Sequence, residues 1–380
     1  MSYLRLDRKW KNETQTETTT FSEALPATGI LSAILINATI YNNSAMYDRP
    51  KRMIHDHLTS LVVKSEGIES FKDIWGPTAI AEYMLQEKKL PPSLIDEMSS
   101  NYQRELIPIM FGRYIGDLRY ALDLSKQGET RLEITNDFTT DDLQATLNIW
   151  YDIDLIFLER IAAPAAFIGT SQISSHTWTG NSQEKTFKVP KKFKVRRILI
   201  GCESYPSDGT SAPSNKSFRN LRYLKYSYRS GALVVMDDDL YRSDQDQMWG
   251  YPDYVQVEKM VEPRTGYYVD TMIDRPVSVQ VTPSYSSDPG SDTELTFDQR
   301  VERWLAYRRA DAGYQGRLFA SGYGALSHKC IHEERGDIDA EWLDPNAEAD
   351  VEVTVGNSSS GGSSGTLRFI TQHLRQNRSV

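Results

Sequence analysis

Two segments of the chain carry histidines at a spacing that is typical of metal ligands. His55 and His57 are two positions apart, and His328, Cys330 and His332 repeat that spacing. On a β-strand such residues point to one face, and zinc binds both histidine and cysteine. A closed zinc site needs four ligands, which one strand cannot supply, and no second cluster completes either set. The sequence therefore predicts no metal at either segment and favours polar strand edges or loops.

Two other motifs fail on order or spacing. Gly361–Gly365 matches the Gly-x-Ser-x-Gly turn of a nucleophilic serine, but that motif needs a later acid and no Asp or Glu follows Ser363. The acidic run Asp237–Asp239, with Asp244 and Asp246, lacks the spacing of a calcium-binding EF-hand and is interpreted as a solvated loop. The sequence therefore predicts no enzyme and no cofactor, and it offers no catalytic, cofactor-binding or metal-ligating residue.

The composition limits the classes of function further. The 380 residues include 43 Lys and Arg against 52 Asp and Glu, a net charge of −9, which argues against sequence-specific nucleic-acid binding. Only two cysteines are present, Cys202 and Cys330, which suits a reducing cytoplasm rather than a disulfide framework. The apolar runs are interrupted by polar residues and fall short of the ~20 that a membrane span needs, and no secretory leader is evident.

Most of the chain alternates polar and apolar residues as β-strands do. Val277–Val281 and Val351–Val355 alternate strictly, and a hairpin turn is expected at Gly128. Short strands between turn clusters predict an all-β sandwich architecture. Helical patterns are few: one follows Pro77, and another covers Phe297–Arg309. We therefore expect short helices set into loops between strands.

The strand pattern divides the chain into an arm and two units. Residues 1–24 have a basic start and a threonine-rich tract, and such tracts cannot order themselves alone, so we expect a flexible N-terminal arm that is dispensable for folding. The segment Ala162–Ala166 interrupts the strands, and a new set starts after Gly169. We therefore expect a first unit over residues 25–168 and a second over residues 172–375.

The order and spacing of the apolar segments resemble a known family of viral shell proteins. The segments that carry the resemblance are Gly29–Ile40, Leu58–Val63, Leu106–Arg113, Lys194–Ile200, Trp342–Pro345 and Ala349–Val355. Together they resemble the double jelly-roll major capsid proteins of tailless icosahedral viruses, the lineage that includes the adenovirus hexon. The likeness spans roughly residues 25–375 and depends on order rather than on any single motif.

The resemblance implies a fold and an assembly. It implies two eight-stranded jelly-roll β-sandwiches side by side, a homotrimer that forms a pseudo-hexameric tile, and an icosahedral shell. Under this resemblance, residues 202–270 are a candidate loop insertion of the second roll. Residues 68–100 are a helix-rich insert, where a plainer family member has a short connection. The implied partners are neighbouring trimers, vertex and minor capsid proteins and an internal lipid membrane contacted by the arm. The implied location is the virion capsid, assembled in the host cytoplasm.

Two other functions stay open at this point. A virion spike, or another β-sandwich module that binds a glycan or receptor, is expected to show a pocket with Trp and Asp side chains. A jelly-roll enzyme is expected to show at least three converging His or Glu ligands. A capsid protein is expected to form tiles.

Overall fold

The computed structural model describes most of the chain. It covers residues 3–16, 18–42, 53–65, 70–92, 101–139, 148–203, 221–239, 254–261, 272–284, 295–297, 305–307, 315–334, 339–348, 350–357 and 365–377. Strands dominate these residues, in agreement with the expected all-β class. No helix in these ranges is long and apolar enough to cross a membrane.

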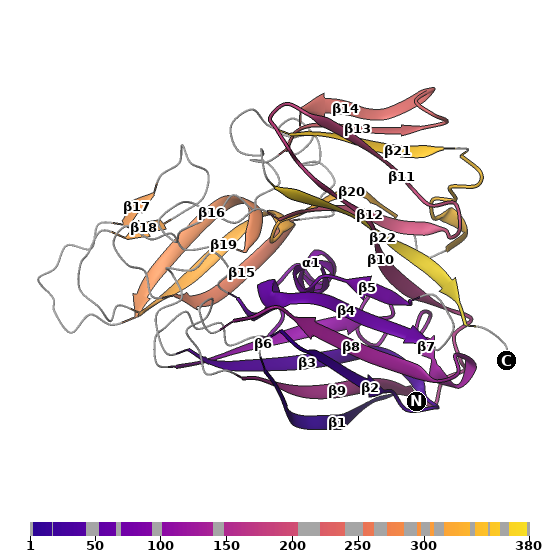
Figure 1. Cartoon of the computed structure of the whole chain (residues 1–380), viewed down its shortest axis with the longest axis vertical. Helices are drawn as coiled ribbons and strands as arrows, with labels where there is room; N and C mark the ends of the chain where they lie inside the picture. Colours follow the sequence, from indigo (N-terminus) through magenta and orange to yellow (C-terminus); the bar gives the residue numbers. More distant parts are fainter. Residues whose placement is uncertain are drawn as a thin grey trace, which may run out of the picture.

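The first half of the chain forms a sandwich of two antiparallel sheets, seen in the lower part of Figure 1. One sheet has the order β1 (Tyr3–Gln15), β9 (Ile149–Glu159), β3 (Ile30–Asn42), β6 (Asn101–Met110), with the short β7 (Leu122–Asp123) also paired to β3. The other has the order β2 (Thr20–Ala24), β8 (Thr130–Asn136), β4 (Leu58–Ser65), β5 (Lys72–Ile74). Along β3, Ile36, Ala38 and Ile40 are fully buried, whereas Asn37 and Thr39 point outward, as the two-residue period requires.

The second half repeats this arrangement in the upper part of Figure 1. One set of neighbouring strands is β20 (His328–Glu333), β12 (Val195–Glu203), β22 (Thr366–Gln376), β10 (Ala166–Thr177), and the facing sheet is β11 (Glu184–Lys188), β21 (Val351–Asn357), β13 (Leu221–Tyr228), β14 (Leu233–Asp239). One hydrophobic cluster lies between its two sheets, and it is separate from the larger cluster that fills the first half and also includes Leu199, Cys330 and Ile370 of the second. Phe187 and Phe369 stack in the cluster between the two sheets with ring centroids 5.1 Å apart.

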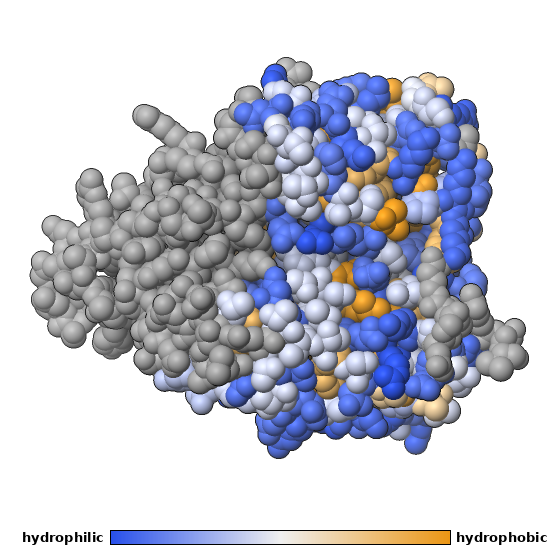
Figure 2. All heavy atoms as spheres, viewed as in Figure 1, coloured by the Kyte–Doolittle hydropathy of each residue, from blue (hydrophilic) through white to orange (hydrophobic). Residues whose placement is uncertain are grey.

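The visible surface of the two sandwiches is mostly hydrophilic. On the face shown in Figure 2, blue and white side chains prevail over both halves, and the apolar ones form only small separate patches. Most of the apolar side chains of the described strands are instead enclosed in the two cores. The alternation of polar and apolar residues along the strands therefore separates an outer face from an inner one in both halves.

Strand β10 joins the two halves into one large sheet. It pairs antiparallel with β22 of the second half and, through Thr170 and Ser171, parallel with Lys72 and Asp73 of β5. The large sheet therefore runs without a break from β2 of the first half to β20 of the second. The boundary expected at residues 169–171 falls inside this strand. The division into two units stays a proposal, which the separate cluster between the two sheets of the second half supports.

The helix α1 (Gly76–Glu87) lies between the two halves (Figure 1). Pro77 occupies its first turn, where the missing N–H costs no hydrogen bond. The helix is buried on nearly all sides, from Gly76 to Leu85. It ends at Lys88, which takes a left-handed conformation (φ 62°) and donates its amide to the Met84 carbonyl at 2.8 Å. The helix expected after Pro77 is confirmed.

A third group of strands projects to the left in Figure 1. It consists of β15 (Tyr254–Val261), β16 (Ile273–Ser284) and β19 (Gln315–Ala325), with the two short strands β17 (Leu295–Phe297) and β18 (Leu305–Tyr307). Both β15 and β16 pair with β19. The remaining short elements are the 3-10 helices η2 (Ile54–His57), η3 (Leu124–Lys126) and η5 (Asp339–Glu341).

The structure corrects the expectation of a flexible arm at residues 1–24. Residues 3–15 form β1, which pairs with β9 along most of its length, and residues 20–24 form β2. Arg5 Nε lies 2.6 Å from Glu159 Oε1, and the Trp10 ring packs edge-on against Phe21 at 5.8 Å. The basic residues therefore belong to an edge strand whose order comes from partners far along the chain, and Thr16, Thr18 and Thr19 lie between β1 and β2.

Two more expectations are corrected. The helix expected over Phe297–Arg309 is wrong where the structure describes it, because Phe297 ends β17 and residues 305–307 form β18, which pair with each other. The loop insertion expected near residues 202–270 contains two strands of the second sandwich itself, since β13 pairs with β21 and β14 pairs with β13. The helix expected within residues 68–100 is present as α1.

Candidate functional site

The first histidine pair lies in a short helix rather than on a strand. His55 and His57 belong to η2, and both are buried. His55 Nδ1 lies 2.7 Å from Glu105 Oε2, and the same carboxylate accepts hydrogen bonds from the backbone amides of Ile54 and His55, each at 3.0 Å. His57 packs edge-on against Phe138. The two imidazoles therefore contact different partners, and His55 satisfies a buried carboxylate rather than a metal.

The second candidate segment does form a strand, but its three side chains separate. β20 has an irregularity opposite Ile198 and Leu199, so Cys330 lies in the first core while His332 contacts Tyr226 beside the second. His328 is fully buried, and its Nε2 lies 3.0 Å from Thr78 Oγ1. Burial lowers the pKa of His328 to about 3, with Arg368 and His55 as minor causes. No group of three potential metal ligands exists among the described residues.

The acidic run begins on a strand rather than in a loop. Asp237 lies on β14, where it accepts a hydrogen bond from the Tyr223 hydroxyl at 2.6 Å and lies 3.5 Å from Lys225 Nζ. The hydrogen bond from Tyr223 lowers the pKa of Asp237. Asp244, Asp246 and Ser363 lie outside the described residues. The acidic run thus starts at the outermost strand of the second half.

A buried polar network, which we call the seam network, joins the two halves. Its members are Lys72, Glu82, Thr170, Arg196 and Gln372. Lys72 Nζ donates to Thr170 Oγ1 at 2.7 Å and lies 3.5 Å from Glu82 Oε2. Glu82 Oε1 accepts hydrogen bonds from Thr170 at 2.5 Å and from Gln372 at 3.0 Å, and Arg196 donates to Gln372 at 2.8 Å. Strands of both halves are thereby tied to α1.

The energetics of the seam network point to a structural role. Burial lowers the pKa of Lys72, although Glu82 opposes the shift, and burial lowers the pKa of Arg196 to about 9. Charges in such a place are tolerated only when they are paired and hydrogen-bonded, and removal of one partner typically costs about 3–5 kcal/mol. The network therefore holds the two halves in one relative orientation.

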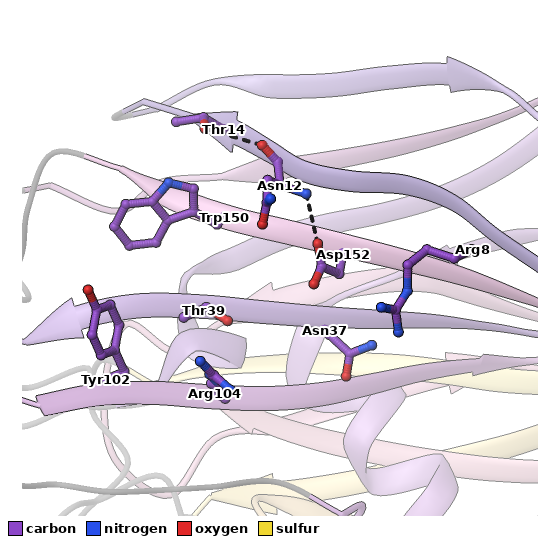
Figure 3. A pocket seen from close by; sticks show the side chains of 9 residues that line it. All are labelled: Arg8, Asn12, Thr14, Asn37, Thr39, Tyr102, Arg104, Trp150 and Asp152. Carbon is purple, nitrogen blue, oxygen red and sulfur yellow. Dashed lines mark hydrogen bonds between the residues drawn. The ribbon is translucent and has the colours of Figure 1, made fainter.

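An open groove of about 600 Å³ lies on the solvent face of the β1–β9–β3–β6 sheet (Figure 3). It is lined by outward-pointing residues of all four strands: Arg8, Asn12, Thr14, Asn37, Thr39, Tyr102, Arg104, Trp150 and Asp152. Two of these side chains are aromatic and three are charged. Sequence reasoning missed this group, because its members come from four distant segments and belong to no motif.

Part of the groove is preorganised by hydrogen bonds. Asp152 accepts a hydrogen bond from the Asn12 backbone amide at 2.7 Å, and Arg8 Nε donates to Asp154 at 2.9 Å. Arg104 forms no ion pair with any residue that the structure describes. Trp150 and Tyr102 lie together at one end of the groove, and Arg8 lies at the other (Figure 3). Aromatic faces beside fixed polar groups are typical of sites that bind small polar ligands.

Comparison with known proteins matches the fold rather than the sequence. No family model and no curated protein matches the chain. VP54 of PBCV-1, fitted into a reconstruction of the virophage Sputnik, is similar with a TM-score of 0.55 at 8% identity, over 98% of this chain and 94% of that one. The structure of Sulfolobus Turreted Icosahedral Virus (STIV) contains a chain similar with a TM-score of 0.54 at 9% identity, over 97% and 90%. The STIV major capsid protein is similar with a TM-score of 0.50 at 10% identity, over 94% of this chain and 98% of that one.

These likenesses establish the fold. The similar structures are double jelly-roll proteins, and the match covers nearly the whole of both chains. The chain therefore has the double jelly-roll fold, and the fold class expected from the sequence is confirmed.

Proposed function

We propose that this double jelly-roll chain is the major capsid protein of an icosahedral virus. The observation that carries the proposal is the match to VP54 over 98% of this chain and 94% of that one. The match therefore extends over nearly the whole of both chains, beyond the length of a single sandwich. A similar chain of comparable length belongs to the PBCV-1 virus capsid, with a TM-score of 0.50.

The seam network supports this proposal physically. A chain whose two rolls are held rigidly together offers two similar lobes as one building block. Three such chains supply six lobes around a threefold axis, which fits a hexagonal lattice site, and closed symmetry satisfies heterologous contacts without leaving an open end. The stable unit in this proposal is a homotrimer, and its principal partners are neighbouring trimers.

The same proposal assigns the chain no catalytic activity and no cofactor. The histidines with ligand-like spacing have internal partners instead, as His55 has in Glu105 and His328 has in Thr78. The remaining partners of the proposal are vertex and minor capsid proteins in the virion capsid, with assembly in the host cytoplasm. Contact between an extended arm and an internal membrane is not part of it, because residues 3–15 are a strand.

The oligomeric state tests the proposal. Native mass spectrometry at micromolar concentration is expected to show a trimer of three 43.3 kDa chains, about 130 kDa. Electron microscopy of the same material is expected to show particles of hexagonal outline that associate edge to edge at higher concentration. A monomer or twofold dimer as the sole species would reject the capsid proposal.

The groove favours a second candidate function, a glycan-binding module such as a virion spike. Trp150 and Asp152 provide the aromatic face and the carboxylate that such a site needs. A glycan array with wild-type protein and the Trp150→Ala variant tests this function. Binding of a defined glycan that Trp150→Ala abolishes, by a protein that forms isolated trimers and never tiles, would favour the spike over the capsid protein.

A further inference from the structure

Two strands with an unpaired edge lie at opposite ends of the molecule. Among the described strands, β1 pairs only with β9, and it lies at the bottom of Figure 1. Within the same set, β14 pairs only with β13, and it lies at the top. An unpaired edge presents free backbone N–H and C=O groups and invites pairing with another chain unless something covers it.

The first part of β1 alternates exposed apolar residues with Arg5 and Asp7, and its next part is basic. Tyr3, Leu4 and Leu6 are 48% to 57% exposed, which is unusual for large apolar side chains. Exposed Arg8 and Lys9 follow them. This surface, which we call the β1 edge, leaves apolar area uncovered next to positive charge.

The unpaired edge of β14 has the same order with the opposite charge. Leu233, Val234 and Val235 are 42% to 53% exposed. The exposed Asp237 follows them and opens the sequence Asp237–Asp239. This surface, the β14 edge, is therefore apolar first and acidic second, in the direction of the chain.

From this match we infer that the β1 edge of one copy pairs in parallel with the β14 edge of the next copy in the ring. The inference depends on the proposed capsid function and names the surfaces that close its trimer. A parallel register that sets Leu4 opposite Leu233 also sets Leu6 opposite Val235 and Arg8 opposite Asp237. On the strand face that carries Leu4, Leu6 and Arg8, apolar residues then meet apolar residues and the charges that meet have opposite sign, which stabilises cross-strand pairs. On the other face, Arg5 and Asp7 meet Val234 and Met236 in both the parallel and the antiparallel register, so that face does not distinguish the two.

The alternatives fit the same residues less well. An antiparallel pairing that keeps Leu6 opposite Val235 would set Leu4 against Asp237 and Arg8 against Leu233, in apolar–charged contacts. Pairing of two β14 edges would bring like carboxylates together in parallel or repeat the apolar–charged mismatch in antiparallel. Because the two edges differ and lie at opposite ends of the molecule, their contact is heterologous, and such contacts close into rings when the rotation allows.

A charge-pair rescue tests the inference. Leu6→Glu and Val235→Lys each place a charge in the apolar part of one edge, and both positions are more than half exposed in the single chain, so folding is expected to survive. Each single variant is expected to weaken trimer association by about tenfold or more, measured by sedimentation velocity. The double variant carries both charges on every chain, so the introduced carboxylate of one copy would meet the introduced ammonium group of the next, and association is expected to recover to near wild type.

The matched control is Val277→Lys on β16, which adds the same charge at a residue that is 62% exposed and lies on neither edge. It is expected to leave the trimer unchanged. Hydrogen exchange of the wild-type protein provides a readout without substitution, with amides of Leu4–Arg8 and Leu233–Asp237 protected in the trimer and exchanging faster on dissociation.

Two results would overturn the inference, and they are distinguishable from each other. If the wild type is trimeric and both single variants keep its affinity, the trimer closes through other surfaces and the capsid proposal stands. If the wild type is a monomer, both the inference and the capsid proposal fail.

Discussion

Thr78 Oγ1 lies 3.0 Å from His328 Nε2, so one buried hydrogen bond joins α1 of the first half to β20 of the second across 250 positions of sequence. The imidazole also packs on Trp75, with ring centroids 5.8 Å apart. Gly201 of β12 faces the same ring, and no larger side chain would fit there without displacement. The position of α1 between the halves is thus specified by individual contacts and not only by apolar burial.

The stability of the protein is expected to fall as the pH falls from about 6.5 toward 4.5. Burial lowers the folded-state pKa of both His328 and His373 to about 3, so below the ordinary value of 6.5 the unfolded chain binds protons that the folded chain does not. Each histidine then costs up to about 1.4 kcal/mol per pH unit. The positive groups nearby act in the same direction: Arg368 and His55 at His328, and Arg375, Lys72 and Lys192 at His373. Urea unfolding at pH 7, 6, 5.5 and 5 measures this dependence.

The variant His328→Asn serves as the control for that measurement. In this variant the number of protons taken up on unfolding, which sets the slope of the unfolding free energy against pH, is expected to be smaller by about one. This holds whether or not the substitution changes the stability at pH 7. A stability that stays constant between pH 6.5 and 5 would contradict the prediction.

Glu82→Gln is expected to destabilise the protein by about 3–5 kcal/mol, because Lys72 would stay buried without its counter-charge. The double variant Lys72→Met with Glu82→Leu removes both charges and is expected to recover much of the loss. Chemical unfolding of the wild type, Lys72→Met, Glu82→Leu and the double variant forms a double-mutant cycle that measures the coupling between the two side chains. A cost below about 1 kcal/mol for Glu82→Gln would show that the ion pair does not hold the seam.

Gly201→Ala is expected to cost about 1–3 kcal/mol, because its Cβ would lie 2.9 Å from His328 Nε2. The cost is expected to shrink when His328 is also changed to Ser, since the smaller side chain leaves room. Thermal unfolding of the two single variants and the double variant measures this coupling. Additive effects would mean that the ring is not the obstacle.

Trp10→Ala is expected to destabilise the first half by about 2 kcal/mol, because Trp10 is half-buried against Phe21 on a strand that is part of the fold. The neighbouring exposed Lys9→Ala is the matched control and is expected to stay within about 0.5 kcal/mol of wild type. Both are compared at one protein concentration, since association also affects apparent stability. Equal stabilities of the two variants would instead support the expectation that residues 1–24 form a flexible arm.

Local pattern made parts of this fold predictable, and distance along the chain made other parts unpredictable. The alternation over Val351–Val355 in β21 and the proline at the start of α1 are local signals, and both elements form as expected. The seam network has no local signal, because Lys72 meets Thr170 across 98 positions and Glu82 meets Gln372 across 290. The same holds for β1, whose polar sequence is ordered by β9 at the other end of the first half.

The pairing of β10 with both β22 and β5 affects how a surface built from many copies of the chain can curve. A bend between the two rolls would strain the pairing of Thr170 and Ser171 with β5, so this pairing opposes a change in the angle between the rolls. The curvature of a surface built from many copies would then depend on the angles at the contacts between copies. The same chain could therefore form surfaces of different size.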